Sequence, residues 1–242
     1  YYGDTRTQTI SVLNRLKENL EEKGLEIGDI IKMTAFLVGD PANGGIMDRD
    51  GFMEGYVQFF GTEEQPIQTV ADFARMGLGA VTEGRALLNH FRRHYQMGVS
   101  GYSMGGNIAA MIGATADFPV AIAPLAASHS PGPVFLDGVI SNGIKWEALG
   151  GPNQRERLRE ALTGASVLRL AAPPWTAAAV MVAARNDGFV PATAVAALHR
   201  HWPGAELRWR RGGHATLLWR QRAVLADAVA ASFDRLTANQ SA

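Results

Sequence analysis

The sequence has 242 residues, with 23 basic side chains, 23 acidic side chains and no cysteine. A chain of this length can bury a sizeable core. Because its net charge is zero, the chain lacks the electrostatic field of one sign that drives non-specific binding to nucleic acid or anionic membranes. The absence of cysteine excludes disulfides and thiolate redox or metal chemistry. From the neutral charge we expect no nucleic-acid partner.

Neither a membrane span nor a leader is predicted. The most apolar run, residues 177–184, has 8 residues, whereas a membrane-spanning helix needs roughly 18 or more. Tyr1 opens the chain without the charged and apolar pattern of a signal peptide. These observations favour a cytoplasmic location and exclude a transmembrane segment.

Composition and charge both change near residue 66. Residues 1–66 contain 2 alanines, against 35 in residues 67–242. The first part has 6 basic and 12 acidic side chains, and the second has 17 basic and 11 acidic side chains. One domain with a polar start and two parts of separate origin are both compatible with this shift, so the motifs must decide.

The first part predicts a helix, a strand and a second helix. Apolar residues recur every three or four positions over residues 9–23, and Gly24 follows as a stop, which is typical of an amphipathic helix. Residues 30–38 are rich in Ile, Phe and Val and predict a strand. Residues 50–60 predict a second helix, which Gly61 closes.

In the second part, apolar segments alternate with helical stretches after a long predicted helix over residues 70–95. The predicted strands are residues 97–101, 119–124, 177–184 and 205–209, and the predicted helices are residues 105–116, 154–162, 192–202 and 215–236. Such alternation predicts an α/β fold with a mainly parallel sheet covered on both faces.

A nucleophile-elbow motif, G-x-S-x-G, lies where the first strand of this series meets its helix. It consists of Gly101, Tyr102, Ser103, Met104 and Gly105. A nucleophilic serine has to stand on a sharp strand-to-helix turn, and we expect the strained backbone to leave no room for side chains at the two flanking glycines. A plain Gly-rich turn that happens to contain a serine is the alternative interpretation.

The residues after the serine extend the same interpretation. The backbone N–H of Met104 and the positive end of the following helix would face a developing oxyanion. Gly106 would add close packing. Ser103 is therefore the candidate nucleophile, and Met104 is the candidate oxyanion donor.

An alpha/beta hydrolase places its acid and its base after the serine, in that order. Asp187 follows a predicted strand in AARNDGFVP, and His214 follows the last predicted strand in RRGGHATLLW. Asp187 would orient the imidazole of His214, which would act as the base. An Asn-Asp-Gly turn and a capping or loop histidine are the alternatives. We interpret the remaining histidines as structural or surface residues: His90, His94, His129, His199 and His201.

From about Ile67 to its end, the chain resembles the alpha/beta hydrolase domain-containing 18 family. The resemblance rests on TVADFARMGLGAVTEG, GYSMGGNIAA, PLAASHSPGPVFLDGVISNGIKWEALG, AARNDGFVP and HWPGAELRWRRGGHATLLWRQ. It implies an alpha/beta hydrolase fold, with Ser103, Asp187 and His214 as nucleophile, acid and base. It also implies hydrolysis of an acyl ester or related bond through an acyl-serine intermediate.

Residues from about 3 to 66 resemble the Rid family of enamine and imine deaminases, whose full domains are small trimers. The segments GDTRTQTISVLNRLKENLEEKGL, DIIKMTAFLVGDPANGG, MDRDGFMEGYVQFFG and TEEQP carry this resemblance. It implies an α+β fragment and a homo-oligomer formed through this part. The opening strands of that family and its substrate-binding arginine after Pro66 are absent, so deaminase activity is not expected.

The hydrolase resemblance also has a gap, because the strands that precede the elbow in that family are absent. The loop that supplies the second oxyanion N–H is absent with them. Loss of one such donor lowers turnover by roughly 100-fold to 1,000-fold in a well-studied hydrolase. We therefore expect an incomplete alpha/beta hydrolase fold over residues 67–242, joined to a Rid-like fragment over residues 1–66.

The sequence as a whole predicts a serine hydrolase that acts on a small-molecule or lipid-like ester, without a cofactor or a metal ion. No H-E-x-x-H pattern or close His and carboxylate cluster is present. The basic run Arg208–Arg211 is interpreted as a solvated strand edge. Two alternatives stay open: a Rid-like deaminase or small-molecule-binding module, and a catalytically inactive fusion with exposed sheet edges.

Overall fold

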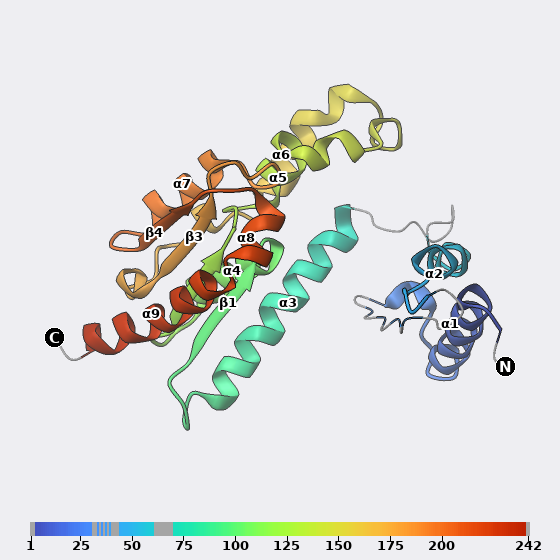
Figure 1. Ribbon diagram of the computed structural model, residues 1–242, viewed down its shortest axis with the longest axis horizontal. Helices are drawn as coiled ribbons and strands as arrows, with labels where there is room; N and C mark the ends of the chain where they lie inside the picture. Colours follow the sequence, from blue (N-terminus) through green and yellow to red (C-terminus); the bar gives the residue numbers. More distant parts are fainter. Residues whose placement is uncertain are drawn as a thin grey trace. The chain divides into compact units, whose positions relative to one another are not determined.

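The computed structural model of the protein describes residues 3–30, 33, 35, 37, 39, 44–60 and 70–240 (Figure 1). Two compact units are present, Tyr1–Leu78 and Gly79–Ala242. The boundary predicted between residues 66 and 67 lies outside the described residues and stays a prediction. Each unit is described by itself.

The first unit contains the two predicted helices. Helix α1 (Thr5–Glu21) begins at Asp4, whose carboxylate accepts a hydrogen bond from the Thr7 N–H at 2.8 Å. This capping contact starts the helix earlier than the apolar pattern alone predicts. After α1, Gly24 adopts a positive φ of 72°, which confirms it as the stop.

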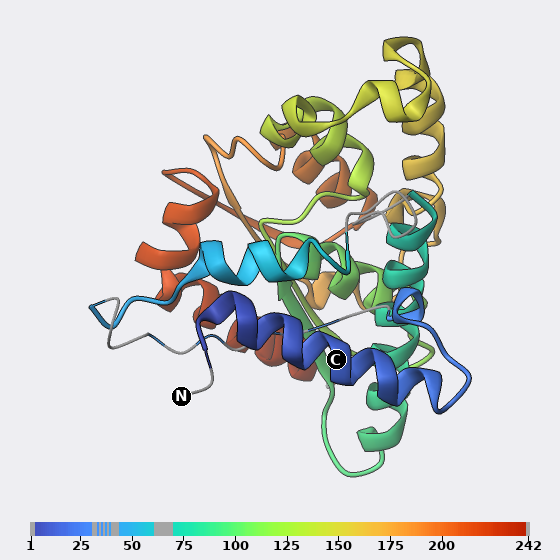
Figure 2. The same ribbon diagram turned by 90° about the vertical axis from the view of Figure 1, so that its right-hand side faces the viewer.

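Helix α2 (Arg49–Tyr56) lies beside α1, as Figure 2 shows. The approach is close at Gly55, where an added Cβ would lie 2.8 Å from the Cβ of Thr9. Helix α2 ends before residue 60, and turns follow it. Between the two helices lies the short 3-10 helix Ile27–Asp29. Most of the predicted strand at residues 30–38 lies outside the described residues.

The predicted alternation of strands and helices is confirmed in the second unit, which includes the C-terminal part of α3. In chain order the elements are α3 (Val70–Phe91), β1 (Gly98–Tyr102), α4 (Met104–Thr115), β2 (Ala121–Leu125), α5 (Pro131–Asp137), α6 (Arg155–Thr163), β3 (Val180–Ala184), α7 (Ala192–His201), β4 (Glu206–Arg210), α8 (His214–Arg220) and α9 (Arg222–Gln240). Short 3-10 helices occur at Val139–Gly143, Trp146–Leu149, Pro152–Gln154, Val167–Arg169 and Thr176–Ala178.

One helix prediction is wrong in its detail. A single helix was expected over residues 215–236, but Gln221 leaves the helical conformation and divides it into α8 and α9. The side chain of Gln221 donates to the Arg211 carbonyl at 2.8 Å and accepts from the Arg210 Nε at 2.8 Å. These hydrogen bonds to the end of β4 hold the break, and the apolar pattern does not encode them. Helix α5 was not predicted.

The four strands form one parallel sheet in the order β1-β2-β3-β4. Each strand therefore lies beside the next one in the sequence, and each connection crosses over one face of the sheet. Both central strands, β2 and β3, are buried along their whole length. This arrangement confirms the α/β class with a mainly parallel sheet.

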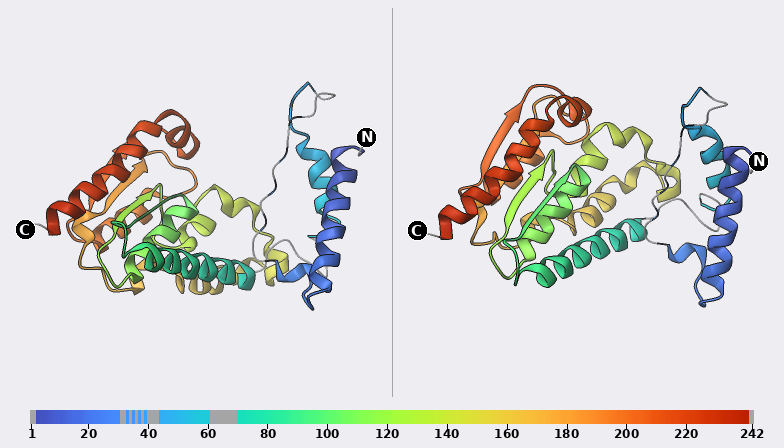
Figure 3. Two further views of the ribbon diagram at one scale, coloured as in Figure 1. Left: turned by 90° about the horizontal axis from the view of Figure 1, so that it is seen from below. Right: turned by 60° about the horizontal axis from the view of Figure 1, so that its bottom comes forward.

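Helices cover both faces of the sheet, as the two views of Figure 3 show. On one face, Leu88 of α3, Ile112 of α4 and Trp202 of α7 pack with Ile122 and Met181 of the central strands. The other face is covered by α8 and α9. Its core contains Leu217, Leu225, Ala228, Val180 and Val182. Alternate residues of each central strand thus enter opposite halves of the core.

We predict that Leu198→Ala lowers the free energy of unfolding by about 2–5 kcal/mol, because Leu198 of α7 is 1% exposed and its truncation leaves a cavity. The matched control is Leu87→Ala on α3, which is 60% exposed and should change stability by less than about 0.5 kcal/mol. Urea unfolding of both variants measures the difference. Equal losses would contradict the packing described here.

Candidate active site

The three candidate catalytic residues follow the carboxyl ends of three strands. Ser103 comes directly after β1, Asp187 lies three residues after β3, and His214 begins α8 after β4. The strands are parallel, so these ends meet at one edge of the sheet. In open α/β sheets, ligands bind outside this edge.

Ser103 occupies a strained turn. Its φ is 59° and its ψ is −118°, a conformation that residues other than glycine rarely adopt. Such strain costs of order 1–3 kcal/mol and persists only where surrounding contacts impose it. Here the Ser103 N–H donates to the Leu125 carbonyl at 2.8 Å, and the Asn107 N–H donates to the Ser103 carbonyl at 3.1 Å. These bonds tie the turn to β2 and to α4.

The glycines of the motif have different roles. A Cβ at Gly101 would collide with the carbonyl oxygen of Gly105, and a Cβ at Gly106 would lie 2.8 Å from the Leu125 carbonyl oxygen. Both sites therefore require glycine, as expected. At Gly105 a Cβ would meet nothing within 4 Å. The expectation that both flanking glycines lack room is wrong for Gly105, because the position that a Cβ would take there is open.

Asp187 and His214 are joined by a hydrogen bond. The Nδ1 of His214 lies 2.7 Å from one carboxylate oxygen of Asp187, and the two side chains are 15% and 3% exposed. The other carboxylate oxygen accepts from the N–H groups of Phe189 and Val190, both at 2.9 Å. A buried carboxylate needs such partners. With Nδ1 donating to Asp187, Nε2 is left as the proton acceptor.

Within the described part of the chain, the hydroxyl of Ser103 makes no hydrogen bond with His214. Bonds of this kind commonly tighten only when a substrate binds. Met104 is the first residue of α4, so its N–H has no acceptor inside the helix, and the residue is 53% exposed. The structure thus joins Asp187 with His214 and leaves Ser103 on the neighbouring turn.

Two aromatic residues at the site were not predicted. The hydroxyl of Tyr102 donates to the His214 carbonyl at 2.6 Å, and the two rings lie 5.1 Å apart between centroids. The ring of Phe189 also lies 5.1 Å from that of His214. Tyr102 occupies the unspecified position of G-x-S-x-G, where the motif carries no signal. Phe189 could have been suspected only from its place two residues after Asp187.

Three other histidines make structural contacts. Nδ1 of His129 lies 3.0 Å from the Ser166 hydroxyl, Nε2 of His199 lies 2.9 Å from the Ala205 carbonyl, and Nε2 of His201 lies 2.8 Å from the Leu170 carbonyl. Burial lowers the pKa of His129, which favours the neutral ring. These contacts agree with the interpretation of the three as structural residues.

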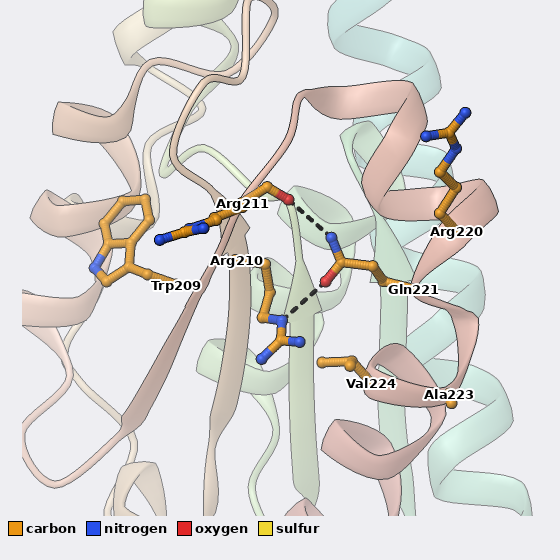
Figure 4. A pocket seen from close by; sticks show the side chains of 7 residues that line it. All are labelled: Trp209, Arg210, Arg211, Arg220, Gln221, Ala223 and Val224. Atoms are coloured by element: carbon orange, nitrogen blue, oxygen red, sulfur yellow. Dashed lines mark hydrogen bonds between the residues drawn. The ribbon is translucent and has the colours of Figure 1, made fainter.

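A surface hollow of about 480 Å³ lies beside the end of β4, and none of the candidate catalytic residues lines it (Figure 4). Its lining residues are Trp209, Arg210, Arg211, Arg220, Gln221, Ala223 and Val224. The guanidinium groups of Arg210, Arg211 and Arg220 point in different directions, so they do not converge on one anion. Arg208 pairs with Glu206 and Asp227, each at 2.6 Å. Most of this basic run belongs to β4, which pairs with β3 alone among the described residues.

Among the described residues, no group of three or more His, Asp or Glu side chains is placed to hold a metal ion. None of the described helices combines the length and the hydropathy that crossing a bilayer requires.

Comparison with protein families gives a match over most of the chain. A sequence model of the family "Alpha/beta hydrolase domain containing 18" matches residues 61–163 and 151–235. The chain belongs to this family. The hydrolase resemblance of the second part is thereby confirmed, whereas the Rid-like resemblance of the first part stays a prediction. No curated protein sequence matches the chain.

Solved structures similar to the chain include hydrolases. The Pyrococcus furiosus esterase Pf2001 is 17% identical, with a TM-score of 0.44, and the match covers 65% of this chain and 61% of the esterase. An alpha/beta hydrolase from a Medee basin deep-sea metagenome, MGS-M2, is 16% identical, with a TM-score of 0.43 and coverage of 62% and 70%. The chain thus spans less than two thirds of the esterase's length.

We predict different effects of alanine at the two neighbouring glycines of α4. Gly106→Ala should lower the free energy of unfolding by about 1–3 kcal/mol, because the new methyl group would press on the Leu125 carbonyl. Gly105→Ala should leave stability equal or raise it by up to about 1 kcal/mol, because alanine favours the helix and meets no neighbour. Chemical denaturation distinguishes them, and equal destabilisation would refute the described turn.

Proposed function

We propose that the protein is a serine hydrolase that cleaves an acyl ester through Ser103, His214 and Asp187. The observation that carries this proposal is the 2.7 Å hydrogen bond between Asp187 and Nδ1 of His214. It selects the imidazole tautomer whose Nε2 can accept a proton. Membership of the alpha/beta hydrolase family and the strained turn at Ser103 support the same chemistry.

In the proposed mechanism, Nε2 of His214 takes the hydroxyl proton as Ser103 Oγ attacks the acyl carbon. Asp187 stabilises the imidazolium that forms. When the tetrahedral intermediate collapses, His214 returns the proton to the leaving alcohol, and an acyl-serine remains. A water molecule then attacks the acyl carbon while His214 again accepts the proton, which releases the acid and restores Ser103.

The oxyanion would be stabilised mainly from α4. The Met104 N–H and the positive end of α4 lie next to Ser103, where the negative charge develops. Each such donor contributes roughly 100-fold to 1,000-fold to turnover in a well-studied hydrolase.

The exposed side chains beside the site favour an ester with apolar parts. Met104, Phe189 and Val139 are large, apolar and exposed, and Val139 adjoins Gly188 through a backbone hydrogen bond of 2.8 Å. Apolar groups at the mouth of a site bind the apolar portion of a ligand. This supports a small-molecule or lipid-like ester as the substrate class.

We predict that Ser103→Ala and His214→Gln each lower the hydrolysis of a p-nitrophenyl ester by at least about a thousandfold, because either change removes the nucleophile-base pair. Fluorophosphonate labelling of the full chain should also disappear in both variants. Ser141→Ala is the matched serine control and should keep the wild-type labelling.

Three other outcomes would overturn the proposal. Labelling retained by Ser103→Ala would place the nucleophile elsewhere. An unlabelled wild-type protein that melts cooperatively would favour the inactive fusion. Ammonia release from an imino acid that Ser103→Ala leaves unchanged would favour the Rid-like deaminase.

A further inference from the structure

Tyr102 links the nucleophile turn to the candidate base. It is the last residue of β1 and directly precedes Ser103, while its hydroxyl reaches the carbonyl of His214, 112 positions later in the chain. We infer that Tyr102 is a positioning residue, which sets the place of His214 relative to Ser103. This inference rests on the proposed function and deepens it.

The contact supplies an anchor that Asp187 does not. Asp187 bonds to Nδ1 and so orients the imidazole, but this bond does not hold the main chain of His214. Tyr102 holds that main chain by its carbonyl, at the first residue of α8. The separation of 2.6 Å lies within the range of good O–H···O bonds. The Asp187 contact orients the ring, and the Tyr102 contact holds the backbone from which the side chain extends.

The Tyr102 side chain is itself held firmly. Its ring packs on the core between the sheet and the helices α8 and α9, a core that includes Leu217 and Leu225. Burial, with the negative charge of Asp187, raises the pKa of the Tyr102 hydroxyl to about 12. The hydroxyl therefore keeps its proton and remains a donor throughout the neutral pH range.

Because Tyr102 and Ser103 are consecutive, the hydroxyl acts as a spacer of fixed length between nucleophile and base. A misplacement of about 1 Å at such a pair can lower the rate by about 100-fold. Loss of the hydroxyl would remove one of two anchors and leave the other. We therefore expect a smaller loss of about tenfold in the reactivity of Ser103.

The first test measures the rate constant of fluorophosphonate labelling in Tyr102→Phe, which removes the hydroxyl and keeps the ring. The matched control is Tyr95→Phe, since Tyr95 lies outside the site and is mostly exposed. We expect complete labelling of Tyr102→Phe at a rate about tenfold lower, and an unchanged rate in the control. An unchanged rate in Tyr102→Phe, or a lower extent of labelling at an unchanged rate, would overturn the inference.

The second test observes His214 without relying on reactivity. A histidine Nδ1 proton bonded to a carboxylate gives a downfield NMR signal, which the His214→Gln variant would assign. We expect this proton to exchange with water faster in Tyr102→Phe than in the wild type and in Tyr95→Phe. Equal exchange rates, or no such signal in the wild type, would overturn the inference.

The two tests separate the possible failures. If the wild type is not labelled, the proposed hydrolase function fails, while the exchange rates still decide whether Tyr102 holds His214. If the wild type is labelled and Tyr102→Phe matches it in both tests, only the role of Tyr102 fails.

Discussion

The positive φ of Ser103 is the constraint on which the rest of the site depends. Serine does not hold this conformation by itself, so neighbouring residues have to impose it. Gly101 and Gly106 do so by allowing the strand, the helix and the Leu125 carbonyl to approach one another without a Cβ between them. The turn then presents the hydroxyl at the start of α4, where a helix is most positive.

The charge of Asp187 imposes a second constraint. A carboxylate with 3% exposure requires partners, and it has two N–H groups from its own loop and the imidazole of His214. The loop that satisfies the acid is thus the loop that places Phe189 against the imidazole. The burial of Asp187, the conformation of its loop and the orientation of the His214 ring therefore depend on one another.

Much of this arrangement could be predicted from the sequence because it depends on local patterns. Alternation of apolar segments fixed the strands and the parallel sheet, and G-x-S-x-G located the turn at Ser103. The contact of Tyr102 with His214 could not be predicted, since it joins positions 112 residues apart and uses a position that the motif leaves open. The break at Gln221 could not be predicted either, because side-chain hydrogen bonds with Arg210 and Arg211 hold it and the apolar pattern does not encode them.

The elbow lies on an edge strand, yet its contacts explain how it keeps its shape. Within the described residues, β1 pairs with β2 alone, and it is less buried than β2 and β3. The contacts that hold the turn lead to β2 and α4. The Ser103 N–H donates to the Leu125 carbonyl, and Gly106 of α4 packs against the same carbonyl. Within the described residues, the turn at Ser103 is therefore held from β2 and α4.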